Sequence, residues 1–266
     1  MGLGVTLPFQ FLPASPPVCW GAAGMETIGT FYGVGVGPGE RGLITVGAWE
    51  AVRRCAKIYV PRATAQDHSI ARACLPENDL PEERFEEIHF DMSLDHYALE
   101  DRYTRLAQNI APQLLAGQSV AYLTLGDAMT YSTLNYALAA VRKACPAAPW
   151  KIFPGITSYC ALAAATGFSL GEKKERVLIL PCPDNVEELR EALAQNPVVV
   201  VMKIGKRLPL VLRVLADLNL LDQSHLGSHV GMPGQQIFSH LRALDPAGSH
   251  GYLSTLLVRN PACFSE

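Results

Sequence analysis

The chain has 266 residues, enough for one large domain or two of medium size. Hydrophobic residues make up 49% of it and charged residues 18%, which is typical of a folded globular protein and not of a disordered or highly charged chain. The formal net charge is −3 and no segment is dense in Lys and Arg, so nucleic acid is not an expected partner. No apolar run reaches the roughly 18–20 residues of a membrane helix, so no membrane association is expected.

The seven cysteines are widely spaced and include no C-x-x-C pair. This spacing favours free thiols in a reducing cytoplasm over a disulfide framework or a Cys-rich metal site, and it predicts a cytoplasmic location. Residues 1–24 contain four prolines and lack the basic stretch of a signal peptide. We expect them to be a disordered extension, with the fold starting at Met25.

From Ile28 onward, short β-rich runs alternate with helical periodicity, which is typical of an α/β protein with a largely parallel sheet. The expected elements of the first half are a strand at 27–36, a helix through 46–56, a strand at 57–60 that stops at Pro61, a helix through 99–114 that is kinked by Pro112 and ended by Gly117, a strand at 119–125 and a helix at 131–143. Two prolines in 145–150 interrupt both periodicities, so we divide the chain there into an N-terminal α/β domain, 25–149, and a C-terminal α/β domain, 150–266.

The second half continues the alternation. Its expected elements are a short extended run at 151–153, a Pro154-Gly155 turn, an Ala-rich helix that ends near Gly167, a strand at 176–180, a helix capped by Asn185, a buried strand at 198–202, a Leu-rich helix at 208–221 and a closing strand at 252–259.

A Gly-rich turn, residues 33–39, follows the first predicted strand. It does not fit the dinucleotide pattern G-x-G-x-x-G, because that pattern requires glycine where Pro38 or Glu40 stands. The chain also has no Gly-Lys-Ser/Thr sequence of a phosphate-binding P-loop. The turn therefore points away from dinucleotides and phosphoryl transfer.

Two further motifs follow predicted strands. In Leu-Thr-Leu-Gly-Asp, residues 123–127, a buried strand delivers Asp127 to the carboxyl edge of the sheet, where open α/β sheets bind ligands. Asp127 can accept hydrogen bonds from a ligand or cap the helix that follows. In Phe-Pro-Gly-Ile-Thr-Ser, residues 153–158, the hydroxyls of Thr157 and Ser158 can cap the Ala-rich helix or face the same crevice.

Together, in this order, the motifs resemble the tetrapyrrole methylase family, the S-adenosylmethionine-dependent enzymes of corrin and sirohaem synthesis. The resemblance extends from about residue 28 to 258 and is marked by Gly-Val-Gly-Pro-Gly at 35–39, Leu-Gly-Asp at 125–127 and Pro-Gly-Ile-Thr-Ser at 154–158. Ala128 stands where the family usually has proline. Within the family, Thr-Phe-Tyr-Gly-Val-Gly from Thr30 and Tyr-Ser-Thr at 131–133 are most similar to the enzymes that methylate C20 of precorrin-2 or cobalt-factor II in cobalamin (vitamin B12) biosynthesis.

The resemblance implies two α/β domains with a cofactor cleft between them, the class III S-adenosylmethionine methyltransferase fold, in a homodimer. It implies S-adenosylmethionine as methyl donor, a tetrapyrrole substrate and no resident metal. The residues that match cofactor-contact positions of the family are Pro38, Leu125, Gly126, Asp127, Tyr131, Thr157, Ser158, Met202, Gly231, Met232 and Ser254.

The catalytic group stays unassigned. Removal of a proton from the methylated carbon needs a base, and the polar candidates are Asp127, Tyr32, Tyr131 and Tyr159, with water as the alternative. The cations that could meet the substrate carboxylates at the cleft rim are Arg41, Lys173, Lys174, Lys203 and Lys206.

Three alternatives remain open. The enzyme could methylate another ring position, act on RNA or protein on the same fold, or bind a small molecule without turnover. A basic surface would favour the RNA methylase, and Ala128 in place of proline is the one hint of a non-catalytic binder. His225 and His229 have i,i+4 spacing, but Gly227 would break a helix between them, so a metal site is not expected there.

Overall fold

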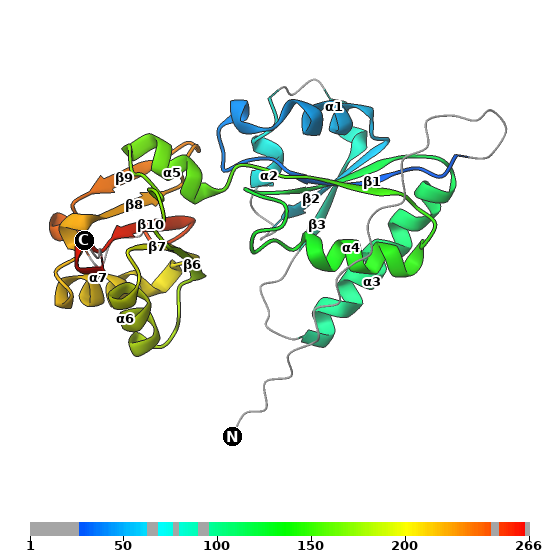
Figure 1. The fold of residues 1–266 in the computed structure, drawn as a ribbon. Helices are drawn as coiled ribbons and strands as arrows, with labels where there is room; N and C mark the ends of the chain where they lie inside the picture. The colour runs from blue at the N-terminus through cyan, green and yellow to red at the C-terminus, as the bar shows by residue number, and fades with distance from the viewer. Residues whose placement is uncertain (1–26, 63–68, 77–79, 90–95, 246–249, 264–266) are drawn as a thin grey trace.

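The computed structural model describes residues 27–62, 69–76, 80–89, 96–245 and 250–263. The predicted extension, residues 1–24, lies outside them. The described residues form two five-stranded sheets, each with helices packed against both faces, and the two sheets lie in separate halves of the molecule (Figure 1). This arrangement is the predicted α/β fold with two α/β units.

The first sheet has the strand order β3-β2-β4-β1-β5 and is parallel throughout. Its strands are β1 (Phe31–Gly35), β2 (Lys57–Arg62), β3 (Phe85–His89), β4 (Val120–Thr124) and β5 (Trp150–Phe153). The helices of this half are α1 (Val46–Arg54), α2 (Ile70–Ala73), α3 (His96–Leu115) and α4 (Leu134–Ala144).

All five residues of the central strand β4 are buried, because helices cover both faces of the sheet. Tyr122 packs in the core formed with α3 and α4, and its neighbour Leu123 packs in the core formed with α1 and α2. Side chains alternate between the two faces of a strand, so a run of apolar residues serves both cores. The carboxyl end of this rigid strand carries the Leu-Gly-Asp motif.

The second sheet has the order β6-β7-β10-β8-β9. Its strands are β6 (Val177–Pro181), β7 (Val198–Met202), β8 (Ser224–Ser228), β9 (Gln236–Ser239) and β10 (Ser254–Arg259), and its helices are α5 (Ser158–Thr166), α6 (Val186–Gln195) and α7 (Leu208–Asp217). Only β6 and β7 pair in parallel, whereas β7–β10, β10–β8 and β8–β9 are antiparallel. The expectation of a largely parallel sheet is therefore right for the first sheet and wrong for the second.

The boundary expected between residues 149 and 150 falls before the last strand of the first sheet. β5 pairs with β1, from Phe31 opposite Trp150 to Val34 opposite Phe153. The prolines of 145–150 only connect α4 to this edge strand, so they mark a loop inside the first unit. The chain leaves the first sheet after Phe153, and α5 packs on the second sheet.

Two predicted boundaries shift for local reasons. β2 continues through Pro61 to Arg62, since beyond Tyr59 it pairs with β3 and no longer with β4, so that the missing N–H of proline is tolerated. The helix expected from residue 131 begins at Leu134, because Tyr131 has a left-handed backbone with φ of 50°.

The sequence interpretation missed β3, β8 and β9. His225 lies in strand β8, where its Nδ1 is 2.9 Å from the Ser239 hydroxyl of β9, and burial followed by the nearby His240 lowers its pKa. The Nδ1 atom of His229 is 2.9 Å from the Ser228 hydroxyl. In the described part of the chain, no three His, Cys, Asp or Glu side chains converge as metal ligands would.

Candidate functional site

The three glycine-containing motifs meet backbone to backbone where β1, β4 and β5 end. A Cβ atom added at Gly155 would lie 2.2 Å from the carbonyl oxygen of Gly126, and one added at Gly35 would lie 2.7 Å from the amide nitrogen of Gly155. Gly37 and Gly126 also exchange two backbone hydrogen bonds, of 3.1 and 2.8 Å. Only glycine permits such close packing. The three motifs therefore form one structural unit, which we call the glycine junction: Gly35, Gly37, Gly126 and Gly155.

Asp127 holds the turn after β4. Its Oδ1 atom accepts hydrogen bonds from Met129 N, Thr130 N and Thr130 Oγ1, each at 2.9 Å, and its Oδ2 accepts one from Gly155 N at 3.0 Å. Burial alone would raise the pKa of this carboxyl group, but the hydrogen bonds outweigh it and hold the pKa below its usual range. Asp127 is therefore a charged carboxylate that links the second motif, Leu-Gly-Asp, to the third, Pro-Gly-Ile-Thr-Ser.

The Tyr-Ser-Thr segment after this turn is anchored to β4 by hydroxyl groups. Thr124 Oγ1 is 3.0 Å from Ser132 Oγ, and Tyr122 Oη is 3.0 Å from Thr133 Oγ1. These contacts hold the Tyr-Ser-Thr segment against the strand that carries the Leu-Gly-Asp motif. Ala128, in the family's proline position, is fully buried, and Asp127 fixes the turn around it.

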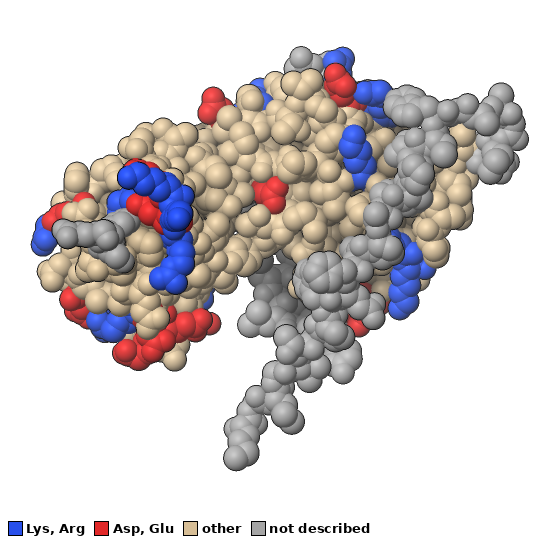
Figure 2. Space-filling view, viewed as in Figure 1, with Lys and Arg blue, Asp and Glu red and all other residues tan. Residues whose placement is uncertain are grey.

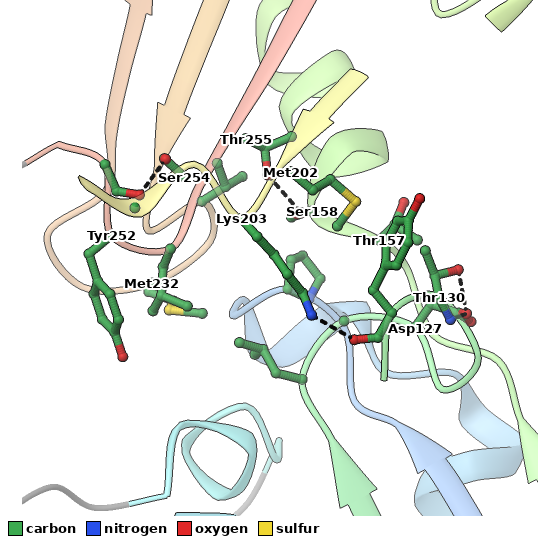
Figure 3. Close-up of a pocket in the computed structure, with 18 of the residues that line it drawn as sticks. Asp127, Thr130, Thr157, Ser158, Met202, Lys203, Met232, Tyr252, Ser254 and Thr255 are labelled. Atoms are coloured by element: carbon green, nitrogen blue, oxygen red, sulfur yellow. Dashed lines mark hydrogen bonds between the residues drawn. The ribbon is translucent and has the colours of Figure 1, made fainter. Parts of the chain in front are cut away.

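A cavity of about 680 Å³ opens between the two halves, next to the glycine junction (Figure 3). It is lined by the loops after β1 and β4, the start of α5, and residues of the second half around β7 and β10. Ten of the eleven residues predicted to contact a cofactor line it: Pro38, Leu125, Gly126, Asp127, Tyr131, Thr157, Ser158, Met202, Met232 and Ser254. Positions from 38 to 254 in the sequence thus converge on one site.

Gly231 is the exception. Its backbone packs against the loop from the first half, where an added Cβ would lie 2.8 Å from the amide nitrogen of Glu40. Its neighbours Val230 and Met232 line the cavity instead. Gly231 therefore serves the contact between the two halves and is not among the lining residues.

Hydroxyl side chains at the start of α5 and of β10 line the cavity. Thr157 caps α5 by accepting a hydrogen bond from Cys160 N at 3.3 Å. Ser158 Oγ lies 2.8 Å from Thr255 Oγ1 of β10, and Ser254 Oγ donates to Gly251 O at 2.6 Å. Met202 and Met232, seen in Figure 3, supply apolar surface to the same cavity, as does Leu125.

Of the four proposed bases, Asp127 and Tyr131 line the cavity, whereas Tyr32 and Tyr159 do not. Tyr32 packs near Phe153, with ring centroids 5.9 Å apart, and Tyr159 packs against the core under α5. The Tyr131 hydroxyl donates to the carbonyl oxygen of Ile179 in β6, at 3.1 Å. Tyr131 thus connects the loop after β4 to the second sheet.

Among the five predicted rim cations, Lys203 lines the cavity and Arg41, Lys173, Lys174 and Lys206 do not. The lining residues that sequence reasoning missed are Thr130, Gly205, Arg207, Val230, Gly251, Tyr252, Leu253 and Thr255. Thr130 and Thr255 adjoin predicted residues, so proximity along the chain was a usable signal for them. Arg207 and Gly251 reach the cavity through the β7–β10 pairing, which no local pattern reveals.

The surface carries mixed charge. On the face seen in Figure 2, Lys and Arg side chains are interspersed with Asp and Glu at the end formed by the second half, and broad areas are uncharged.

Helices long and apolar enough to cross a bilayer are absent from the described ranges. The described cysteines Cys55, Cys74, Cys145, Cys160, Cys182 and Cys263 are free thiols, as predicted.

Comparison with known proteins decides the family. The profile of the Tetrapyrrole (Corrin/Porphyrin) Methylases matches residues 30–245, most of the chain. The chain belongs to this family. Among curated tetrapyrrole methylases, the cobalt-precorrin-2 C(20)-methyltransferase of Salmonella typhimurium is 30% identical over 239 residues, covering 90% of this chain and 99% of that protein. The precorrin-2 C(20)-methyltransferase of a Sinorhizobium species is 31% identical over 204 residues, covering 74% and 82%.

Solved structures of methyltransferases share the fold. The methyltransferase CobJ superposes with a TM-score of 0.61 at 23% identity, covering 88% of this chain and 94% of that one. A uroporphyrin-III C-methyltransferase from Thermus thermophilus, solved with S-adenosylhomocysteine, gives a TM-score of 0.58 at 17% identity, covering 87% and 97%. The two-domain class III methyltransferase fold expected from the motifs is confirmed.

Proposed function

We propose that this tetrapyrrole methylase transfers a methyl group from S-adenosylmethionine to C20 of precorrin-2 or cobalt-factor II, a step of cobalamin biosynthesis. Two relatives named for C20 methylation match it over 99% and 82% of their length. The observation that carries the proposal is the convergence of the three family motifs on one cavity between the halves. We assign methyl-donor binding to this cavity and to its predicted contact residues.

The cavity fits the methyl donor. Its volume of about 680 Å³ lies in the range of small-molecule sites. A nucleoside and a sulfonium need apolar walls and a few hydrogen-bonding groups, and Leu125 and Met202 supply the former while Ser158 and Thr255 supply the latter. The donor carries no phosphate, so the lack of a P-loop sequence agrees with this ligand.

Bound S-adenosylmethionine supplies a methyl group already activated by the sulfonium, which leaves the chain to bind and align both reactants. Alignment of this kind can lower a barrier by about 7–11 kcal/mol in favourable cases. The glycine junction fixes one wall of the cavity, and the bond from Tyr131 to Ile179 ties that wall to the second sheet. A rigid two-sided cleft is what such alignment requires.

The proton lost from the methylated carbon leaves, we infer, to water. Asp127 is the only carboxylate among the described lining residues, and both its oxygens already accept hydrogen bonds from the turn and Gly155. The Tyr131 hydroxyl is engaged as a donor to Ile179. The hydrogen bonds lower the pKa of Asp127 and so make it a weak base, and the Tyr131 hydroxyl is held as a donor, so we assign both residues the role of organising the site.

The resemblance further supports a homodimer in the cytoplasm. Light scattering coupled to size-exclusion chromatography measures the assembly, for which we expect twice the 28.8 kDa of one chain. A monomeric mass would contradict the dimer and leave the proposed chemistry standing.

The function is tested by anaerobic incubation of the purified protein with S-adenosylmethionine and, in parallel, metal-free precorrin-2 and cobalt-factor II. A reaction without the donor is the control. We expect the mass of one macrocycle to rise by one methylene equivalent, and the preferred acceptor shows whether cobalt enters before or after this step. A macrocycle unchanged in both reactions, with the donor bound, would indicate the non-catalytic binder instead.

A further inference from the structure

Lys203 occupies a constrained position at the end of β7. Its backbone is left-handed, with φ of 55°, an unusual conformation for a residue other than glycine. Arg207 supports it, because its Nη2 donates to Lys203 O at 2.8 Å and its Nε to Ile204 O at 3.2 Å. Backbone strain of this kind persists where the surroundings impose it, and it clusters at ligand sites.

The side chain of Lys203 spans the cavity toward the first half (Figure 3). Its Nζ donates to the carbonyl oxygen of Tyr131 at 3.2 Å and lies 5.9 Å from the centroid of the Tyr131 ring. Tyr131 is itself left-handed, with φ of 50°. Two strained residues, one from each half, therefore hold an ammonium group over the cavity.

Among the described residues, no carboxylate neutralises the positive charge of Lys203. Both groups that Nζ contacts are uncharged, and no described carboxylate forms an ion pair with it. The other cation that lines the cavity, Arg207, pairs with Asp184 at 2.6 Å. An ammonium has three N–H donors, so the bond to Tyr131 leaves donors for a ligand.

We propose that Lys203 is a specificity-determining residue whose ammonium group binds a carboxylate of a ligand in the cavity. The proposal rests on the proposed function and deepens it. Two reactants carry this chemistry: the amino-acid end of the methyl donor, and the acidic side chains of the macrocycle. A hydrogen bond from a charged donor to a carboxylate contributes more to the binding free energy than one from a neutral donor. Removal of the charge will therefore weaken ligand binding measurably.

The test compares Lys203→Met, which keeps side-chain length without charge, with Lys203→Arg, which keeps the charge. Calorimetry measures the Kd for S-adenosylhomocysteine, which tests whether Lys203 binds the methyl donor. The KM for the macrocycle at saturating donor tests whether Lys203 binds the methyl acceptor. For Lys203→Met we expect one of these constants to rise by roughly 10- to 100-fold, with kcat changed much less, and Lys203→Arg to recover most of the loss. Lys143→Met, an exposed lysine of α4 outside the cavity, is the matched control and should change neither.

A rise confined to the S-adenosylhomocysteine Kd assigns the carboxylate to the donor, and a rise confined to the macrocycle KM assigns it to the acceptor. Both constants unchanged, or both weakened without rescue by Lys203→Arg, would overturn the proposal. If the wild-type protein transfers no methyl group, the proposed function fails. The role of Lys203 can still be tested, because calorimetry and fluorescence titration measure binding of S-adenosylhomocysteine and of the macrocycle without turnover. Failure to bind either ligand would overturn both.

Discussion

Asp127 shows how a single carboxylate can order the wall of a cavity through its hydrogen bonds. Its two oxygens connect the turn after β4 to the turn after β5, through Thr130 and Gly155. From the sequence, ligand binding and helix capping were equally open for it. The structure shows a third role, which is to link two turns. This role could not be predicted from a local pattern, because the partner Gly155 is 28 residues away in the sequence.

Asp127→Asn replaces one acceptor with an N–H donor facing the amide of Gly155. We expect a loss of about 1 kcal/mol in unfolding free energy at pH 7, since the group is partly exposed. The folded pKa of Asp127 is lowered from 3.8, so its contribution is present above that pH and is lost as pH falls through the folded value. Urea unfolding should show the two proteins converging below about pH 4. A difference that persists unchanged in acid would contradict this role.

Gly155 has a steric role that predicts a large effect from one methyl group. Gly155→Ala places a Cβ 2.2 Å from the carbonyl oxygen of Gly126, so the junction must shift. We expect a loss of about 1–3 kcal/mol in stability, together with weaker binding of S-adenosylhomocysteine. Gly42→Ala, where an added Cβ meets nothing within 4 Å, is the control. Equal behaviour of the two variants in thermal unfolding and calorimetry would disprove the steric account.

At the scale of elements, the parallel half of the fold was predictable and the antiparallel half was less so. β1, β2 and β4 are apolar runs in a sheet buried on both faces, so they stand out in the sequence. β3 was missed because Glu86 and Glu87 make it look like a loop, although as an edge strand it pairs only with β2. β8 was missed because His225 and Gly227 break its apolar pattern.

The link between the loop after β4 and strand β6 depends on one hydroxyl group. In Tyr131→Phe the bond to Ile179 is lost, and the ring remains. If Tyr131 only ties the halves together, we expect kcat/KM to fall less than about tenfold, with the shape of its pH profile unchanged. A loss of several orders of magnitude, or a displaced pH profile, would instead make Tyr131 a proton-transfer group.

At the scale of the whole molecule, the site exists only between the two halves. The motifs that follow β1, β4 and β5 predicted seven of its lining residues, because these strands end at one edge and carry recognisable glycines: Pro38, Leu125, Gly126, Asp127, Tyr131, Thr157 and Ser158. The second half contributes through β7 and β10, whose antiparallel pairing brings Met202 opposite Thr255. That contribution depends on long-range pairing, so Arg207 and Gly251 could not be predicted locally.

The central claim is that this cleft directs a methyl group to C20. The most direct test is a single turnover with S-adenosylmethionine carrying a ¹³C-labelled methyl group, followed by NMR of the isolated macrocycle. The account predicts one labelled methyl signal that correlates with C20 alone. A label at any other carbon of the ring would contradict the C20 assignment, while the family assignment would still stand. An unlabelled macrocycle would contradict the methyltransferase activity itself.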